Sequence, residues 1–265
     1  MKSIPFLLLS GFFILANSVS LAQTPQPPPQ TPQRLPDGGT REVLISILIP
    51  SLRNAPFTAT VNTEWIRQLP DGSTITLKNH RAIARDAAGR IFQERRALVP
   101  DDSKTKSGVT QIEISDPVTH ELYICMPHGN TCQLEEFSPL ESAPYGAPGK
   151  AHMAQGSPSE SEDLGKQSIG GLETVGTRET TIIPAGTIGN NSPLMSKREF
   201  WYSPQLGVNL ISKRQDPLSG MQNFELSDIT VGEPDANLFE VPSGFKILDL
   251  RKPTELSSPP ASSPN

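Results

Sequence analysis

Turn-forming sequences recur about every ten residues along this chain, and no other feature of the sequence constrains the fold more. Such turns stand at LPDGST, RDAAGR, PHGN, PAGTIGNN, SPQLG, DPLSG, GEPDAN and VPSG. Between them lie short stretches rich in Val, Ile, Thr and aromatic residues, such as TQIEI, RETTIIP and VNLISK. Short strands at regular spacing predict an antiparallel sheet, a sandwich or a barrel. We therefore expect a mainly β protein with few short helices.

The stretch FTATVNTEW shows the expected strand pattern most clearly. Its apolar residues recur at alternate positions, at Phe57, Ala59, Val61 and Trp65. Successive side chains of a strand point to opposite faces, so this strand should bury one face and expose the other. Helical patterns are rare, and only DANLF (235–239) is expected to form a helical turn.

Pro-rich and polar segments divide the chain. Residues 23–40 form a Pro/Gln-rich linker, which favours extended and solvated backbone. Residues 138–163 contain few large apolar side chains, so we expect a disordered insertion there, and 253–265 is expected to be a disordered tail. Residues 41–137 and 164–252 remain as β-rich halves, each with the length of a small domain. Neither half has a self-contained pattern, so we expect the second half to complete the sheet of the first.

The first 22 residues have the features of a secretory signal peptide. Lys2 is followed by the nearly all-apolar run Ile4–Leu15 and then by SVSLAQ, in which Ser20 and Ala22 are the small residues before the expected cleavage point. A membrane anchor is the alternative, but the run has about a dozen residues and a membrane span needs about 20. We expect export to the periplasm or to the outside of a bacterial cell, with no transmembrane span after cleavage.

Both cysteines lie in the stretch YICMPHGNTC, with a histidine between them. A four-residue loop at Pro127–Asn130 would place Cys125 opposite Cys132 on neighbouring strands, at a separation that suits a disulfide. Two cysteines in an exported protein are usually paired in this way. Zinc is the alternative, with His120 and His128 as further ligands, but the C-x2–4-C spacing of structural zinc sites is absent, as is the C-x-x-C motif of redox catalysts. We expect a disulfide, no metal and no cofactor.

Catalytic motifs are missing from the sequence. It contains no G-x-S-x-G elbow, no H-E-x-x-H and no Walker loop. SGFK (243–246) matches S-x-x-K, but it lies at an expected turn and has no companion motif. SIGG (168–171) has too few glycines for a phosphate cradle and is better explained as a bend between strands. We therefore predict that the protein is not an enzyme and has no catalytic residues.

Positive charge gathers in the first half of the chain. Residues 41–100 hold nine Lys and Arg against five Asp and Glu, whereas residues 101–265 hold twelve against twenty-two. The excess centres on 78–96, where DAAG is expected to form a four-residue hairpin loop with Arg85 opposite Arg90. These strands would either bind an anion or form an exposed sheet edge whose charges discourage edge-to-edge pairing. Nucleic acid is not expected, because domains that bind it are more basic and carry aromatic platforms.

The stretch REFWYSP places three aromatic residues in succession. Neighbouring strand residues point to opposite faces, so both faces of this strand carry large aromatic surface. Such strands belong in the middle of a sheet that is covered on both sides, once by its core and once by a second layer, a partner or a ligand. We therefore name Phe200, Trp201 and Tyr202 as candidate ligand-binding residues, and core packing on both sides is the alternative.

Several stretches carry a resemblance to known families. APFTATVNTEWIRQLPDGSTITLKNHRAIARDAAGRIFQERR resembles uncharacterised exported proteins of acidobacteria-like bacteria. GGLETVGTRETTIIPAG, REFWYSP, LISKRQDPLSG and LSDITVGEPDANLFEVPSGF, in this order, more distantly resemble the periplasmic lipoprotein-carrier-like fold. This resemblance implies a curved antiparallel sheet, or half-barrel, that encloses an apolar cavity. Short helices cover the cavity in those carriers, and this sequence lacks a pattern for them.

These observations predict an exported cell-envelope protein of non-enzymatic type that binds a lipophilic ligand or an envelope protein. The alternative is an envelope structural or interaction module without a small ligand, and an exported hydrolase ranks third. A carrier should have an apolar cavity. An interaction module should have an exposed patch and a free sheet edge. A hydrolase should have convergent polar groups in a cleft. Neither the identity of the ligand or partner nor the oligomeric state follows from the sequence.

Overall fold

The computed structural model describes residues 46–102, 104–139 and 159–251. The expected signal peptide (1–22), linker (23–40) and tail (253–265) lie outside these residues, as does most of the expected insertion. The described part consists of strands and turns, and its only helices are two short 3-10 helices. The prediction of a mainly β protein with few short helices is therefore confirmed. None of the helices in the described ranges is long and apolar enough to cross a membrane.

The strands fall into two series along the chain. The first half contributes β1 (Phe57–Gln68), β2 (Thr74–Arg85), β3 (Ile91–Arg96), β4 (Val99–Pro100), β5 (Val109–Asp116), β6 (Glu121–Met126) and β7 (Thr131–Glu136). The second half contributes β8 (Ser159–Ile169), β9 (Leu172–Ile183), β10 (Leu194–Ser203), β11 (Val208–Asp216), β12 (Gly220–Val231) and β13 (Lys246–Asp249). The 3-10 helices are η1 (Pro127–Gly129) and η2 (Ala236–Phe239).

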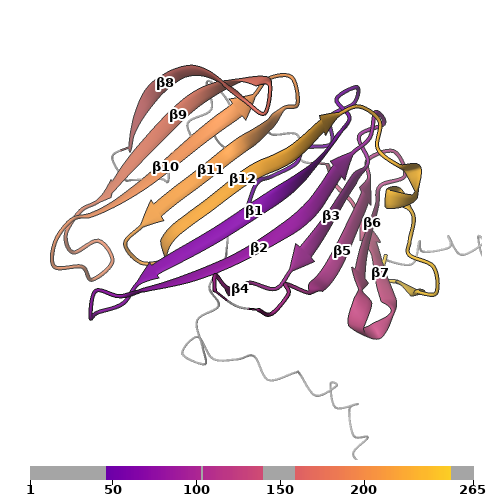
Figure 1. Ribbon diagram of the computed structural model, residues 1–265, viewed down its shortest axis with the longest axis horizontal. Coiled ribbons are helices and arrows are strands. Elements are labelled where there is room, and N and C mark those ends of the chain that lie inside the picture. Colours follow the sequence, from indigo (N-terminus) through magenta and orange to yellow (C-terminus); the bar gives the residue numbers. More distant parts are fainter. Residues whose placement is uncertain (1–45, 103, 140–158, 252–265) are drawn as a thin grey trace, which may run out of the picture. The chain divides into compact units, whose positions relative to one another are not determined.

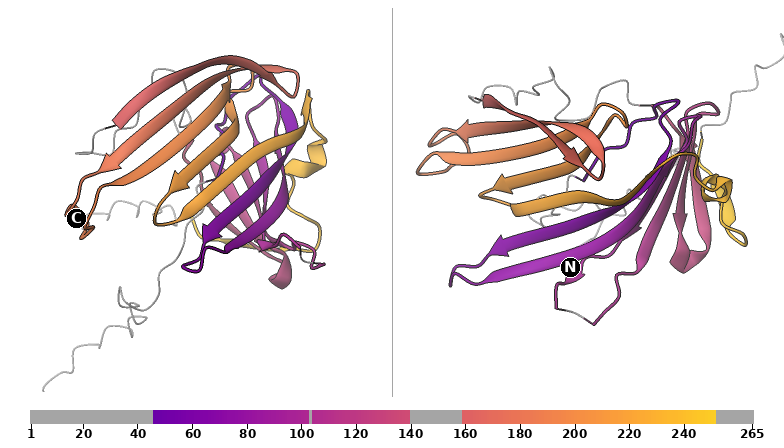
Figure 2. Two further views of the ribbon diagram at one scale, coloured as in Figure 1. Left: turned by 60° about the vertical axis from the view of Figure 1, so that its left-hand side comes forward. Right: turned by 45° about the horizontal axis from the view of Figure 1, so that its top comes forward.

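All these strands belong to one sheet, which curls without closing (Figures 1 and 2). Its order is β13-β7-β6-β5-β3-β2-β1-β12-β11-β10-β9-β8, and β4 lies beside β2. Neighbouring strands are antiparallel, except that β13 is parallel to β7. The first half of the chain thus runs outward from the centre of the sheet to one edge, and the second half starts at the other edge and returns until β12 pairs with β1. That the two halves fold as one unit stays a prediction.

The two faces of the sheet are covered differently. Phe57, Ala59, Val61 and Trp65 of β1 are buried, which confirms the predicted alternation. We call the side to which they point the inner face. Residues 46–56, which we call the inner strap, contribute Ile47 and Ile49 to the core of this face. That core comprises Ile47, Ile49, Phe57, Ala59, Val61, Ile83, Ile91, Leu172, Leu206, Val208, Leu210, Phe224 and Leu226.

A smaller core lies on the opposite, outer face, where η2 covers the sheet. Phe239 of η2 packs with Ala84, Phe92 and Ile114. The Asp235 carboxylate accepts a hydrogen bond from the backbone N–H of Asn237 and caps the helix. The helical turn predicted at DANLF is therefore confirmed.

The hairpin between β2 and β3 corrects the predicted register by one residue. Arg85 lies opposite Ile91, and not opposite Arg90 as predicted. The loop has three residues, because the N–H of Asp86 donates to the carbonyl of Arg90 and Gly89 takes a left-handed conformation with φ 89°. Loops of three residues with a left-handed last position are common in hairpins. A shift of one residue changes which side chains share a face, and Arg85 lies opposite Phe57, on the inner face.

The start of β8 corrects the predicted boundary of the insertion 138–163. Residues 159–163 form strand, and Glu162 lies opposite Arg178 of β9. An edge strand pairs on one side only and is often charged, so its composition resembles that of a loop. The bend predicted at SIGG is confirmed, since β8 and β9 meet at Gly170 and Gly171, which both have positive φ.

Candidate functional site

A hollow of about 120 Å³ opens on the inner face beside Phe200. We call it the Phe200 hollow, and it is lined by Ser46, Leu48, Arg198, Phe200, Asn209, Ser212, Lys213 and Arg214. Pairing of β10 with β11 sets Phe200 opposite Ser212 and Arg198 opposite Arg214. Among the described residues no carboxylate lines this hollow. It therefore brings arginine, lysine and serine side chains beside an aromatic ring and a leucine, and the guanidinium of Arg214 is also paired with Asp216 at 3.5 Å.

A second hollow, of about 310 Å³, also touches Ser46 of the inner strap. We call it the Arg81 hollow, and it is lined by Ser46, Thr63, Asn79, Arg81, Arg95, Arg96, Leu98 and Phe224. Arg95 donates two hydrogen bonds of 2.9 Å to the carboxylate of Glu113. Arg96 is paired with Glu94 at 2.8 Å. The charges of these two arginines are therefore balanced by carboxylates.

Arg81 differs from its neighbours because its hydrogen-bond partners are neutral. Its side chain is 3% exposed and donates to Ser46 Oγ at 2.8 Å and to Gln93 Oε1 at 3.4 Å. Burial, together with the positive charge of Arg95, lowers the pKa of Arg81 to about 10. The guanidinium is still protonated at neutral pH. A buried cation is costly unless an anion compensates it, and the negative charges of Glu113 and Glu94 compensate Arg81 in part, because they act against the lowering of its pKa.

Several buried polar atoms have no hydrogen-bond partner within the described part of the chain, and three of them belong to strand residues of the inner face. They are Asn79 Oδ1, Gln222 Oε1 and Arg214 Nε. Pairing sets Gln222 of β12 opposite both Arg214 and Trp65, and Asn79 opposite Thr63. An unpartnered buried polar group costs about 1–3 kcal/mol. Two acceptors and one donor are thus available to a bound molecule.

Arg85, in contrast, is satisfied by backbone carbonyls. Its guanidinium donates to the carbonyl oxygens of Pro50, Ala55 and Leu206 and lies 5.1 Å from the ring centroid of Phe57. Burial lowers the pKa of Arg85 to about 10. Since Pro50 and Ala55 belong to the inner strap, this arginine holds the strap on the sheet. We assign it a structural role.

The three predicted ligand-binding residues do not share one face. Phe200 is buried and lines the Phe200 hollow. Trp201 points to the outer face, where its ring covers Gly176 so closely that a Cβ there would meet it at 2.7 Å. The indole Nε1 of Trp201 donates to Glu199 Oε1 at 3.0 Å. Tyr202 is half-buried. Ligand binding by any of the three stays a prediction.

Sequence reasoning missed Asn79, Arg81, Arg214 and Gln222. A signal for Arg81 was present, because it lies two residues before Ile83 in TITLKNHRAIAR and so shares the face of an apolar residue. Arg214 and Gln222 had no such signal. Their importance follows from the pairing of β11 with β12, which the sequence does not specify.

A row of mostly charged side chains crosses the outer face, and we call it the outer ion row. Pairing aligns Glu162, Arg178, Glu199, Lys213, Asn223, Glu64 and Lys78 on β8 to β12, β1 and β2. Arg178 bridges Glu162 at 2.9 Å and Glu199 at 3.0 Å. Lys78 bridges Glu64 at 3.2 Å and Asp101 at 2.9 Å. Burial acts to raise the pKa of Glu199, but hydrogen bonds from Trp201 and Arg178 outweigh it and hold the pKa below its ordinary value.

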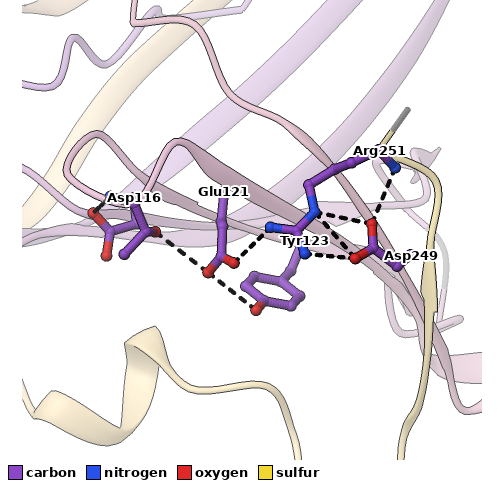
Figure 3. A network of polar contacts seen from close by, with 6 residues as sticks. Asp116, Glu121, Tyr123, Asp249 and Arg251 are labelled. Atoms are coloured by element: carbon purple, nitrogen blue, oxygen red, sulfur yellow. Dashed lines mark hydrogen bonds and ion pairs between the residues drawn. The ribbon is translucent and has the colours of Figure 1, made fainter. Parts of the chain in front are cut away.

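A network of polar contacts fastens β13 to the sheet (Figure 3). Arg251, just after β13, donates to Glu121 of β6 at 2.9 Å and is also paired with Asp249. The hydroxyl of Tyr123 donates to the same Glu121 at 3.2 Å. Burial, together with the negative charge of Glu121, raises the pKa of Tyr123. The network joins β6 to the end of β13.

The hairpin of β6 and β7 has the predicted register, with Cys125 opposite Cys132 and Met126 opposite Thr131. The two sulfur atoms are 2.00 Å apart, at disulfide distance. The Nδ1 of His120 lies 3.2 Å from the carbonyl oxygen of Phe137. The described residues contain no group of three or more His, Cys, Asp or Glu side chains that could hold a metal ion.

Comparison with known proteins assigns no family to the chain. No family model matches it, and no curated protein does. Among solved structures, a chain of the MucA/MucB complex of Pseudomonas aeruginosa is 13% identical with a TM-score of 0.38, over 74% of this chain and 59% of that one. An uncharacterised conserved protein from Thermus thermophilus is 9% identical with a TM-score of 0.37, and the match covers 73% of this chain and 90% of that one. A LolA superfamily protein from Nitrosomonas europaea is 11% identical with a TM-score of 0.28, and the match covers 70% of this chain and 90% of that one. The chain thus spans less than two thirds of the first of these.

Proposed function

We propose that this protein is a non-enzymatic binding protein of the bacterial cell envelope, and that the inner face of its sheet holds the ligand. The ligand would be an amphiphile, with an apolar body against Leu48 and Phe200 and a negatively charged group near the arginines. Export is part of the proposal, and it is supported by the signal-peptide pattern and by two cysteines at disulfide distance.

One observation carries the proposal. Gln222 is 2% exposed and its Oε1 has no partner in the described part of the chain, while Arg214 Nε directly across the strand pair also has none. Natural proteins leave few such groups, because each costs stability. A ligand that reaches this position would supply both a donor and an acceptor. The apolar walls and the nearby guanidinium groups match an amphiphile better than a purely apolar molecule.

The two tryptophans allow a direct test, since they lie on opposite faces. Trp65 lies beside Gln222 on the inner face, and Trp201 lies on the outer face. We expect sodium decanoate to shift the emission of Trp65 in a Trp201→Phe variant. The emission of Trp201 in a Trp65→Phe variant should not change. Decylamine has the same chain and the opposite charge, and should bind more weakly because arginines line both hollows.

Arg214→Met is the matched binding variant, because it removes the charge and keeps most of the apolar stem. It should weaken decanoate binding by about tenfold, the loss of one charge-assisted hydrogen bond. A response of Trp201 without one of Trp65 would move the site to the outer face. The absence of any response, by fluorescence and by calorimetry, would favour an interaction module without a small ligand.

A further inference from the structure

Exposed apolar side chains gather on three hairpins that end at the same end of the sheet (Figures 1 and 2). Twelve large apolar residues of the described chain are exposed, and six of them lie on these hairpins, with exposures from 36% to 67%. They are Leu69 and Ile75 on the β1–β2 hairpin, Ile188 and Met195 on the β9–β10 hairpin, and Leu218 and Met221 on the β11–β12 hairpin. Scattered single exposed residues need no explanation, but a grouped set does.

The loops of these three hairpins are almost uncharged. Residues 69–73, 184–193 and 217–219 contain one charged residue, Asp71, whereas 19% of the whole chain is charged. The carboxylate of Asp71 accepts hydrogen bonds from the N–H and the hydroxyl of Ser73 within its own turn. These loops therefore expose apolar and neutral polar groups, unlike an ordinary solvated surface.

Two of the hairpins and β10 meet in one continuous surface. A hollow of about 410 Å³ is lined by residues of β1, β2, β10 and the β11–β12 hairpin, among them Ile66, Met195, Leu218 and Met221. The indole Nε1 of Trp65 donates to the carbonyl of Ser219 at 2.8 Å and fixes the β11–β12 loop against β1. We call this surface, with the three hairpin loops, the apolar rim.

Positive side chains lie directly behind the apolar rim on the outer face. Lys197 and Lys213 are exposed, and with Arg178 and its partner Glu199 they line a hollow of about 280 Å³. That hollow shares Gln215 and Met221 with the rim. The apolar side chains thus lie at the hairpin loops, and the lysines lie farther from the loops along β10 and β11.

We propose that the apolar rim docks on the surface of a lipid bilayer. The loop side chains enter the boundary between headgroups and acyl chains, and Lys197 and Lys213 lie at the level of anionic headgroups. Apolar tips on separate hairpins suit a broad, deformable surface better than a single pocket on a protein. Lysines near an anionic membrane each add attraction that salt weakens. The proposal does not depend on the ligand of the inner face, and the rim pair and Lys197 test it separately, because Lys213 also lines the Phe200 hollow.

Co-sedimentation of the full chain with lipid vesicles tests the proposal. The protein should bind vesicles of phosphatidylcholine weakly and vesicles that also contain phosphatidylglycerol more strongly. Ile188→Ser together with Leu218→Ser should lower the partition coefficient by about tenfold, since two apolar side chains lose partial burial. Val118→Ser together with Leu248→Ser is the matched control. These residues are 58% and 52% exposed, against 54% and 67% for the rim pair, and lie away from the rim, so binding should not change.

The charge variants separate the two contributions. Lys197→Gln and Lys213→Gln should each lower binding to the anionic vesicles by about fivefold and leave binding to phosphatidylcholine unchanged. The proposal is overturned if the wild-type protein binds neither vesicle, or if the control pair loses as much binding as the rim pair. The protein could instead self-associate with rising concentration and not bind vesicles. If Ile188→Ser together with Leu218→Ser abolished that self-association, the rim would be assigned to a second copy of the chain.

Discussion

The two faces of the sheet treat their polar groups in opposite ways. On the outer face, the charges of the outer ion row meet partners on neighbouring strands, as Arg178 does with Glu162 and Glu199. On the inner face, Arg81 has only neutral hydrogen-bond partners, and Gln222 Oε1 has none in the described part of the chain. Arg178 and Lys78 on the outer face are thus paired with carboxylates, whereas the inner face has ion pairs such as Arg95 with Glu113 and also keeps donors and acceptors that another molecule would satisfy.

This difference distinguishes charged side chains that stabilise the fold from polar side chains that could bind another molecule. Cross-strand ion pairs at a solvated surface contribute little each, and they mainly specify which strands pair. Buried unpartnered groups lower stability and are retained where they serve another purpose. Arg85 shows that a buried arginine on the inner face is not functional merely by being buried, because three carbonyls accept its hydrogen bonds. The partner of each group, more than its burial, indicates its role.

Arg85→Met should have the largest effect on stability. The substitution leaves the carbonyls of Pro50, Ala55 and Leu206 without their donor and releases the inner strap, so we expect a loss of about 3–5 kcal/mol. Urea unfolding followed by circular dichroism measures it. Arg178→Met on the outer face is the control and should cost less than about 1 kcal/mol. Equal losses would remove the distinction between the two faces.

The cysteine pair should be the largest single contribution on the outer face. We predict that Cys125 and Cys132 are bonded, so intact mass after alkylation without reductant should show no modified thiol. Replacing both by alanine should lower the free energy of unfolding by about 2 kcal/mol, a modest value because the closed loop is short. Two alkylated cysteines in freshly isolated protein would refute the bond and reopen the zinc interpretation.

Gln222 and Asn223 are adjacent and point to opposite faces, so they compare the faces most directly. Gln222→Leu removes an unpartnered acceptor and should stabilise the fold by about 1 kcal/mol, while decanoate binding should not change, because a carboxylate has no donor for this acceptor. Asn223 donates to Glu64 at 2.9 Å in the outer ion row. Asn223→Leu should therefore destabilise by about 1 kcal/mol and leave binding unchanged. Thermal unfolding and a decanoate titration of both variants decide the matter, and a destabilised Gln222→Leu would mean that this side chain has a partner.

The smallest effect should come from acid titration of the outer ion row. The folded pKa of Glu199 lies below its ordinary value of 4.5, so its contribution to stability is complete above that value and is lost as the pH falls through the folded pKa. Glu199→Gln should make the fall in melting temperature in acid shallower and should cost less than about 1 kcal/mol at neutral pH. An unchanged acid limb would show that Glu199 is not coupled to folding.

The two first-half hairpins show how far local sequence determines register. PHGN gave the correct pairing of Cys125 with Cys132, because the proline and the glycine restrict that loop to one length. DAAG predicts a loop of four residues, one more than the structure has. Asp86 can either be part of the loop or pair with Arg90 and close it, and in the structure it pairs with Arg90. The predicted register would set Ile83 opposite Phe92, whereas Ile83 lies opposite Gln93. One residue of loop length therefore decided on which face the side chains of β3 lie relative to those of β2.

The sequence by itself determined the class of fold, the alternation in β1, the turn positions and the cysteine hairpin. These features depend on residues within about ten positions of each other, and local backbone preferences and side-chain periodicity govern them. Only the tertiary structure decided that β12 pairs with β1 and that the inner strap packs on the core of the inner face. It also decided the alignment of Arg214, Gln222 and Trp65 on three neighbouring strands. The last set joins residues from opposite ends of the described chain. Its members become neighbours only through backbone hydrogen bonds between strands, and those bonds are the same whatever side chains the strands carry.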